Sequence, residues 1–187
     1  VNDVTTPLHL MQPDYPHAYG APAADDIEQV LLRIYNYLDK VTPAQLVNKN
    51  SGEAITDFAA LDQNSIMKPG DFRLNSYEWG VTYAAMLLAA KQTGDQQYSE
   101  YVSERLGFLA EALSAFSDFE KQNPGVDFQL YRSLHPHALD DCGAICAAMI
   151  KATQSNEAEE LDWIINNYIE YISNKQFRLE DGTLARN

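Results

Sequence analysis

The 187-residue sequence predicts an all-α fold in which helical hairpins form an inner and an outer layer of a ring, an α/α toroid. Five segments have the apolar spacing of helices, and amphipathic segments alternate with segments that are apolar nearly all round. The sequence shows no series of strand patterns. Only residues 177–186, around Asp181-Gly182, are typical of a short β-turn element.

The five helical segments divide into two kinds. Apolar residues at helical spacing in 27–38, 98–116 and 161–172 leave one polar face each, which is typical of outer helices. Residues 77–90 and, after its first acids, 139–150 are apolar on nearly all sides and rich in alanine. These two segments are therefore predicted to be buried inner helices that pack closely.

The order of the segments also predicts how the chain is organised. A ring of six hairpins needs twelve helices and roughly 300 residues. Residues 23–187 are therefore predicted to be either about the first half of such a six-hairpin barrel or a smaller helical array. Residues 1–22, rich in Pro, Asp and Asn, are predicted to form an extended arm. The long connections 42–76 and 123–137 are expected to carry function.

Composition excludes several classes of partner. A net charge of −14 argues against nucleic acid and anionic membranes, and no apolar run is long enough to span a bilayer. The chain starts at Val1 rather than Met, which favours an export signal that has been removed and thus a periplasmic or otherwise exported protein. Cys142 and Cys146, one helical turn apart, are predicted to be buried free thiols rather than a disulfide or a metal pair.

Two adjacent acids, Asp140 and Asp141, open the second buried segment. Acids in the first turn of a helix are often no more than caps, since the helix dipole stabilises negative charge there. At 100° per residue, Asp141 lies nearer the apolar face than Asp140 does. We therefore expect Asp141 to be the functional acid, ionised and suited to orient a hydroxyl or stabilise a cationic transition state.

Aromatic residues open the first buried segment. Ser76 is a predicted N-cap, and Tyr77 and Trp79 follow it, at the same end as Asp141 if the two helices are parallel. Aromatic rings beside a carboxylate suit a sugar, although both rings are equally compatible with a core role. Arg73, just before them, is suited to pair with an acidic sugar or with Asp71.

The motif His135-Pro136-His137 precedes the two acids. In a loop it is more often a hydrogen-bonding or substrate-contacting element than a metal site. The sequence contains no nucleophile motif, phosphate loop, dinucleotide fingerprint or zinc spacing. We therefore expect chemistry by carboxylates, without metal or cofactor, or no chemistry.

Three runs, NSYEWGVTYAAML, HPHALDDCGAICAAMI and LEDGTLARN, resemble the unsaturated rhamnogalacturonyl hydrolases of glycoside hydrolase family 105, which are related to the unsaturated glucuronyl hydrolases of family 88. The resemblance covers the chain from about Asp14 onward. It implies an α/α toroid that hydrates the C4–C5 double bond of a terminal Δ4,5-unsaturated uronic acid on pectin-derived oligosaccharides. No metal or cofactor is implied.

The resemblance also implies roles for particular residues. Asp141 matches one of the family's two catalytic aspartates, and Tyr77, Trp79, His135 and Asp140 are candidates for substrate binding. The resemblance places the proton donor in a Trp-x-Asp element after DGTLARN, beyond the last residue of this sequence. The 187 residues alone are therefore expected to lack it. The alternatives are a non-catalytic carbohydrate-binding or interaction module and a toroid of other chemistry, such as a sugar epimerase.

Overall fold

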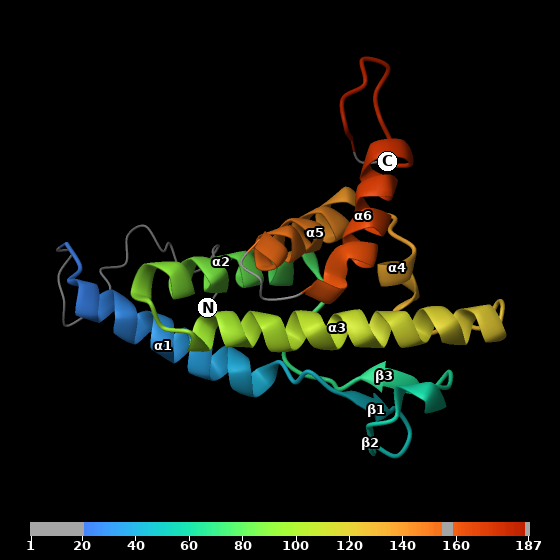
Figure 1. Ribbon diagram of the computed structural model, residues 1–187, viewed down its shortest axis with the longest axis horizontal. Helices are drawn as coiled ribbons and strands as arrows, with labels where there is room; N and C mark the ends of the chain where they lie inside the picture. Colours follow the sequence, from blue (N-terminus) through green and yellow to red (C-terminus); the bar gives the residue numbers. More distant parts are fainter. Residues whose placement is uncertain (1–20, 155–158, 186–187) are drawn as a thin grey trace, which may run out of the picture.

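The computed structural model describes residues 21–154 and 159–185, and most of them are helical (Figure 1). Nearly all of the predicted arm, residues 1–22, lies outside the described residues. All five predicted helices are present and follow one another in the predicted order, which confirms the all-α fold. They are α1 (Ala24–Val41), α2 (Tyr77–Thr93), α3 (Gln97–Gln122), α5 (Leu139–Gln154) and α6 (Asp162–Asn174).

The two inner helices, α2 and α5, run parallel and share the largest interface between any two helices. Their first turns meet at Tyr77 and Asp141, and one turn later Gly80 lies against Ala144. A Cβ atom on Gly80 would lie 2.4 Å from the carbonyl carbon of Ala144, so only glycine permits this approach. The parallel arrangement on which the predicted shared site depended is therefore confirmed.

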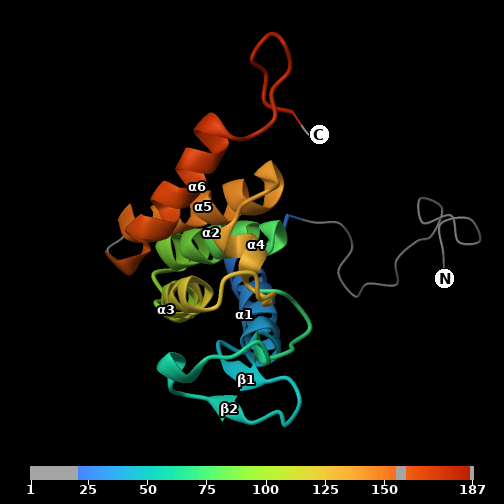
Figure 2. The ribbon, with the colours of Figure 1, turned by 90° about the vertical axis from the view of Figure 1, so that its right-hand side faces the viewer.

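The outer layer consists mainly of α3 and α6. Gly94, at a φ of +76°, ends α2 and allows the chain to turn back into α3. Figure 2 shows α3 end-on, with α2, α5 and α6 stacked on one side of it and the strands on the other. The short 3-10 helix η3 (Glu159–Leu161) leads into α6, which packs on α5. These layered hairpins are consistent with an α/α toroid.

Both α1 and α2 keep an exposed apolar stripe. On α1, Leu31, Tyr35 and Leu38 pack against the core, whereas other apolar residues, among them Ile27 and Ile34, remain exposed. On α2, the prediction of burial on most sides holds for one face only. The opposite face exposes apolar side chains because no described element covers it; they include Tyr77, Val81 and Leu88.

The connection between α1 and α2 contains strands that the sequence did not predict. It forms an antiparallel sheet in the order β2-β1-β3, with the 3-10 helix η2 between its last two strands. Each strand has only two or three residues, too few to show an alternating pattern. The elements are β1 (Leu46–Asn48), β2 (Ala54–Ile55), η2 (Phe58–Ala60) and β3 (Ser65–Met67).

Two smaller features complete the fold. The second long connection contains a single helical turn, α4 (Tyr131–Leu134). Beyond α6, Arg178 pairs with Leu184 around Gly182, whose φ is +85°. This pairing confirms the turn predicted at 177–186. Within residues 21–154 and 159–185, no helix is both long and apolar enough to cross a membrane.

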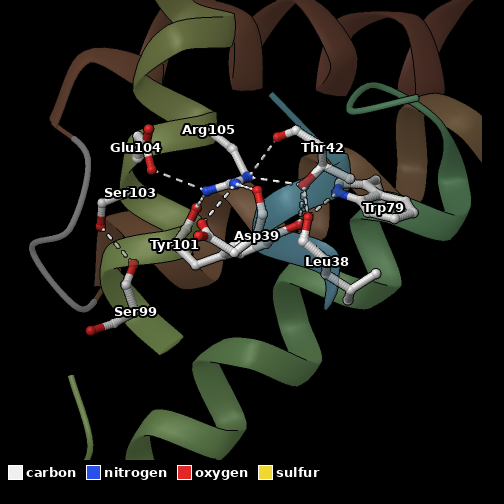
Figure 3. Close-up of polar contacts among 9 residues, drawn as sticks. All are labelled: Leu38, Asp39, Thr42, Trp79, Ser99, Tyr101, Ser103, Glu104 and Arg105. Carbon is white, nitrogen blue, oxygen red and sulfur yellow. Dashed lines mark hydrogen bonds and ion pairs between the residues drawn. The ribbon is translucent and has the colours of Figure 1, made fainter. Parts of the chain in front are cut away.

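A buried polar network joins the end of α1 to α3 and α2 (Figure 3). Arg105, which is 2% exposed, donates hydrogen bonds to the backbone carbonyls of Asp39 and Thr42 and forms an ion pair of 3.0 Å with the Asp39 carboxylate. Its guanidinium lies 3.7 Å from the ring centre of Tyr101. The network thus closes the C-terminal end of α1, where carbonyls lack helical partners.

The direction of the remaining hydrogen bonds in this network follows from the number of available protons. The Thr42 hydroxyl donates to the carbonyl of Leu38 at 2.6 Å, so it must accept from the Tyr101 hydroxyl, 2.9 Å away. The Tyr101 oxygen in turn accepts from Nε1 of Trp79 at 3.2 Å. Side chains of α1, α2 and α3 are therefore held in one chain of hydrogen bonds.

Candidate active site

A cleft of about 200 Å³ lies at the N-terminal ends of the two inner helices. Both long connections contribute to it, as the sequence predicted, and α6 supplies one buried tyrosine. Its polar lining consists of Arg73, Asn75, Ser76, Gln129, Arg132, Ser133, His137, Asp141 and Tyr168. A larger open groove of about 660 Å³ lies along α3, but it contains none of the predicted functional residues.

Among the described residues that line the cleft, Asp141 is the only acid. Its Oδ1 accepts a hydrogen bond of 3.1 Å from the backbone N–H of Tyr77, at the start of α2. The carboxylate therefore lies at the N-terminal ends of two helices, its own and α2, and both ends favour negative charge. Asp141 is half-buried and Asp140 exposed, as the helical wheel predicted.

The start of α2 is capped differently from the prediction. Ser76 occupies the N-cap position, but its hydroxyl donates to the carbonyl of Arg73 at 3.3 Å rather than accepting from the helix. Asp141 takes that acceptor role across the helix interface. On the exposed side, a hydrogen bond from Ser76 and another from its own N–H lower the pKa of Glu78.

Two hydrogen bonds join the connections that form the cleft walls. The Asn75 amide donates to the Ser133 hydroxyl at 2.7 Å, and the N–H of Met67 donates to Oε1 of Gln129 at 2.6 Å. Segments more than 50 residues apart in the chain are thus fixed against each other. The cleft is therefore bounded by walls that are tied together, which favours ligand binding with little rearrangement.

A comparison with known protein families matches residues 37–187 to the family described as Glycosyl Hydrolase Family 88. The chain belongs to this family. A comparison with curated proteins found no match. Family 88 membership makes the protein a glycoside hydrolase with an oligosaccharide substrate, and it supports an unsaturated uronic acid as the sugar on which it acts. The match is to family 88 and does not distinguish the rhamnogalacturonyl hydrolases of family 105, which the sequence resembles.

In this family 88 protein, the predicted aromatic residues occupy different surroundings. Trp79 is 4% exposed, stacks on Phe72 at 4.7 Å and donates its indole N–H to Tyr101. The structure thus gives Trp79 the core role that the sequence left as the alternative to substrate contact. Tyr77 is exposed at the cleft end of α2, although its ring is not part of the lining.

The two histidines of the His-Pro-His motif point to different sides. Nε2 of His135 contacts the Glu120 carboxylate at 2.8 Å, and its ring lies 4.4 Å from that of Tyr131. These contacts hold His135 against α3 and α4, away from the cleft lining, whereas His137 is part of it. Searching the described part of the chain gave no group of three or more His, Cys, Asp or Glu residues that could hold a metal ion.

Sequence reasoning missed several residues of the cleft, among them Arg132 and Tyr168. Tyr168 belongs to the apolar stripe of α6 and was therefore assigned to the core, where burial raises the pKa of its phenol strongly. It remains a hydrogen-bond donor at any ordinary pH. Arg132 could have been noticed in the sequence because it is a cation in a long connection of a strongly acidic chain.

Proposed function

We propose that this protein acts on oligosaccharides whose non-reducing end carries a Δ4,5-unsaturated uronic acid, and that its substrates are pectin-derived rhamnogalacturonan fragments. The observation that carries the proposal is the position of Asp141, the one carboxylate of a cleft built at two helix N-termini. The choice of rhamnogalacturonan rests on the resemblance of the NSYEWG, LDDCGA and DGTLARN runs to family 105.

The proposed reaction is the hydration of the C4–C5 double bond. A carboxylic acid protonates C4, and positive charge develops at C5. The oxygen of a water molecule then bonds to C5, and a proton of that water passes to a base. The product is a hemiketal at C5, which opens and releases the next sugar. Asp141, held as a hydrogen-bond acceptor, is suited to orient this water or to stabilise the cationic transition state.

The proton donor in this scheme is a second carboxylic acid. Asp141 is less suited to that role, because its Oδ1 already accepts a hydrogen bond from the N–H of Tyr77. The family resemblance places the donor C-terminal to the DGTLARN run. The two acids would then have separate tasks, as in other carboxylate-based hydrolases.

The test is an assay with unsaturated oligosaccharides that polysaccharide lyases produce from rhamnogalacturonan and, for comparison, from homogalacturonan. Hydration removes the conjugated double bond, so its ultraviolet absorbance should fall as the protein turns over. Fragments ending in unsaturated rhamnogalacturonyl units should react faster than unsaturated homogalacturonan fragments. Binding without loss of absorbance would favour the non-catalytic carbohydrate-binding module instead.

We also propose that the protein is exported, with the periplasm as its location. The support is its proposed role on polysaccharide fragments. Cell fractionation of the producing bacterium with antibodies to this chain tests the location. Recovery of the protein with the cytoplasm would contradict it.

A further inference from the structure

The cleft around Asp141 carries a local charge opposite to that of the protein. The whole chain has 27 acids against 13 Lys and Arg residues. The lining of the cleft instead contains two arginines, Arg73 and Arg132, and one carboxylate. A cleft whose lining is cationic, in a protein that is strongly acidic as a whole, favours an anionic ligand.

Neither arginine has a carboxylate partner among the described residues. Across residues 21–154 and 159–185, neither Arg73 nor Arg132 forms an ion pair with a carboxylate. The sequence offered Asp71 as a partner for Arg73, but the Asp71 carboxylate accepts from the Tyr37 hydroxyl at 2.7 Å. The charge of Arg73 acts on Glu78, where it is a minor cause of that residue's lowered pKa.

The backbone positions of the two arginines are fixed relative to each other. Arg132 is next to Ser133, and Arg73 is two residues before Asn75; the hydrogen bond of 2.7 Å between Asn75 and Ser133 joins their segments. Both arginines therefore belong to segments that this hydrogen bond joins in the cleft wall. Both side chains are exposed, so a ligand can reach them without displacing a protein partner.

We propose that Arg73 and Arg132 together recognise the carboxylate of the uronic acid and place its ring beside Asp141. A guanidinium binds a carboxylate through two parallel N–H donors, which fixes orientation as well as charge. The pair would thus select acidic sugars over neutral ones. This inference deepens the proposed function and rests on it for the identity of the sugar.

Binding tests the inference without any need for turnover. The probes are galacturonate, a saturated uronic acid, and its uncharged methyl ester, measured by titration calorimetry or by ligand-observed NMR. Wild-type protein should bind galacturonate about tenfold or more tightly than the ester, which corresponds to one charge-assisted interaction. Added NaCl should weaken the binding of galacturonate and leave that of the ester unchanged.

Substitutions assign the effect to residues. Arg132→Gln and Arg73→Gln should each weaken galacturonate binding about tenfold, with the methyl ester unaffected. Arg33→Gln removes the same charge from an exposed site on α1 and should change neither. Thermal unfolding of each variant checks that the fold is kept. If Arg73→Gln does not fold, Arg132→Gln and the salt dependence still decide the matter.

The inference is overturned if the wild type binds neither probe, if it binds both equally, or if both cleft variants bind galacturonate as the wild type does. The proposed function fails separately. Arginine-dependent binding of galacturonate without loss of the double bond in unsaturated substrates would leave the carboxylate site standing and reject the hydrolase. Turnover with an unchanged KM in Arg132→Gln and Arg73→Gln would support the hydrolase and reject the carboxylate site.

Discussion

The backbone N–H of Tyr77 donates a hydrogen bond of 3.1 Å to Oδ1 of Asp141, 64 residues further along the chain. This bond joins the first turns of the two inner helices. The carboxylate thus accepts from an N–H in the first turn of α2. Ser76, the N-cap residue of α2, provides no side-chain acceptor there. Asp141 therefore has a structural task and, in the proposed mechanism, a chemical one.

Asp141→Asn separates these two tasks. The amide oxygen still accepts from Tyr77, so the free energy of unfolding should change by less than about 1 kcal/mol. The negative charge is lost, and turnover of the unsaturated substrate should fall at least about 100-fold. Steady-state kinetics and urea denaturation measure the two effects.

A matched control for this variant is Asp162→Asn, which changes a first-turn acid of α6 outside the cleft. It should leave turnover near the wild-type rate. Near-normal turnover in Asp141→Asn as well would reduce Asp141 to a cap that joins two helices.

Gly80→Ala tests the close contact between the inner helices. The added methyl group would lie 2.4 Å from the carbonyl carbon of Ala144, and backbone cannot move aside as a flexible side chain can. We expect a loss of about 1–3 kcal/mol in the free energy of unfolding. Turnover should also fall, because separating the helices lengthens the Tyr77–Asp141 bond.

Gly107→Ala is the control, because it adds the same methyl group to a helix interior. No atom outside its own helix lies within 4 Å of the new Cβ, so the substitution should stabilise the protein by up to about 1 kcal/mol. Equal effects of the two substitutions would show that helix propensity, rather than contact with Ala144, makes Gly80 necessary.

The five long helices could be predicted from the sequence because each has at least 13 residues, enough for the apolar spacing to repeat several times. The strands could not, since β2 has two residues and β1 and β3 have three each. Their pairing depends on the path of the whole connection. That path is set by contacts such as the buried side chain of Leu46, which local sequence does not reveal.

The candidate site was predictable only in part, for a related reason. Asp141 could be singled out because its position on a helical wheel is fixed by the helix itself. His135 and His137 look equivalent in sequence, and only the contact of His135 with Glu120 separates them. Arg132 and Tyr168 reach the cleft through tertiary packing, which no local pattern in the chain reports.

Arg105→Lys tests whether the buried guanidinium is needed for its several donors. Lysine cannot reach the carbonyls of Asp39 and Thr42 at once, so buried acceptors at the end of α1 would lose their partners. The expected loss is about 2–4 kcal/mol in the free energy of unfolding, measured by urea denaturation.

Asp39→Asn provides the comparison for that variant. The Asp39 side chain is 49% exposed, so water screens its ion pair with Arg105, and the substitution should cost less than about 1 kcal/mol. A cost as large as that of Arg105→Lys would mean that the ion pair, not the capping of α1, is the main contribution.

The two cysteines predict a pH dependence at the alkaline end. Cys142 and Cys146 are both buried and unpaired, as the sequence predicted. Burial, followed by the neighbouring Cys146, raises the pKa of the Cys142 thiol from 9.0 to about 11. Between these values the unfolded chain loses a proton that the folded chain retains, so the free energy of unfolding should fall as the pH rises.

The measurement is the difference between wild type and Cys142→Ala, because tyrosines away from Cys142 contribute equally to both. Cys142 itself raises the pKa values of Tyr168 and Tyr171, so their share belongs to the Cys142 effect. Wild type should lose more stability than the variant between pH 9.0 and about 11. At about pH 8 a thiol reagent should react with neither cysteine until the protein is unfolded. Rapid labelling of the folded protein, or parallel stability curves for the two proteins, would contradict the burial of the Cys142 thiol.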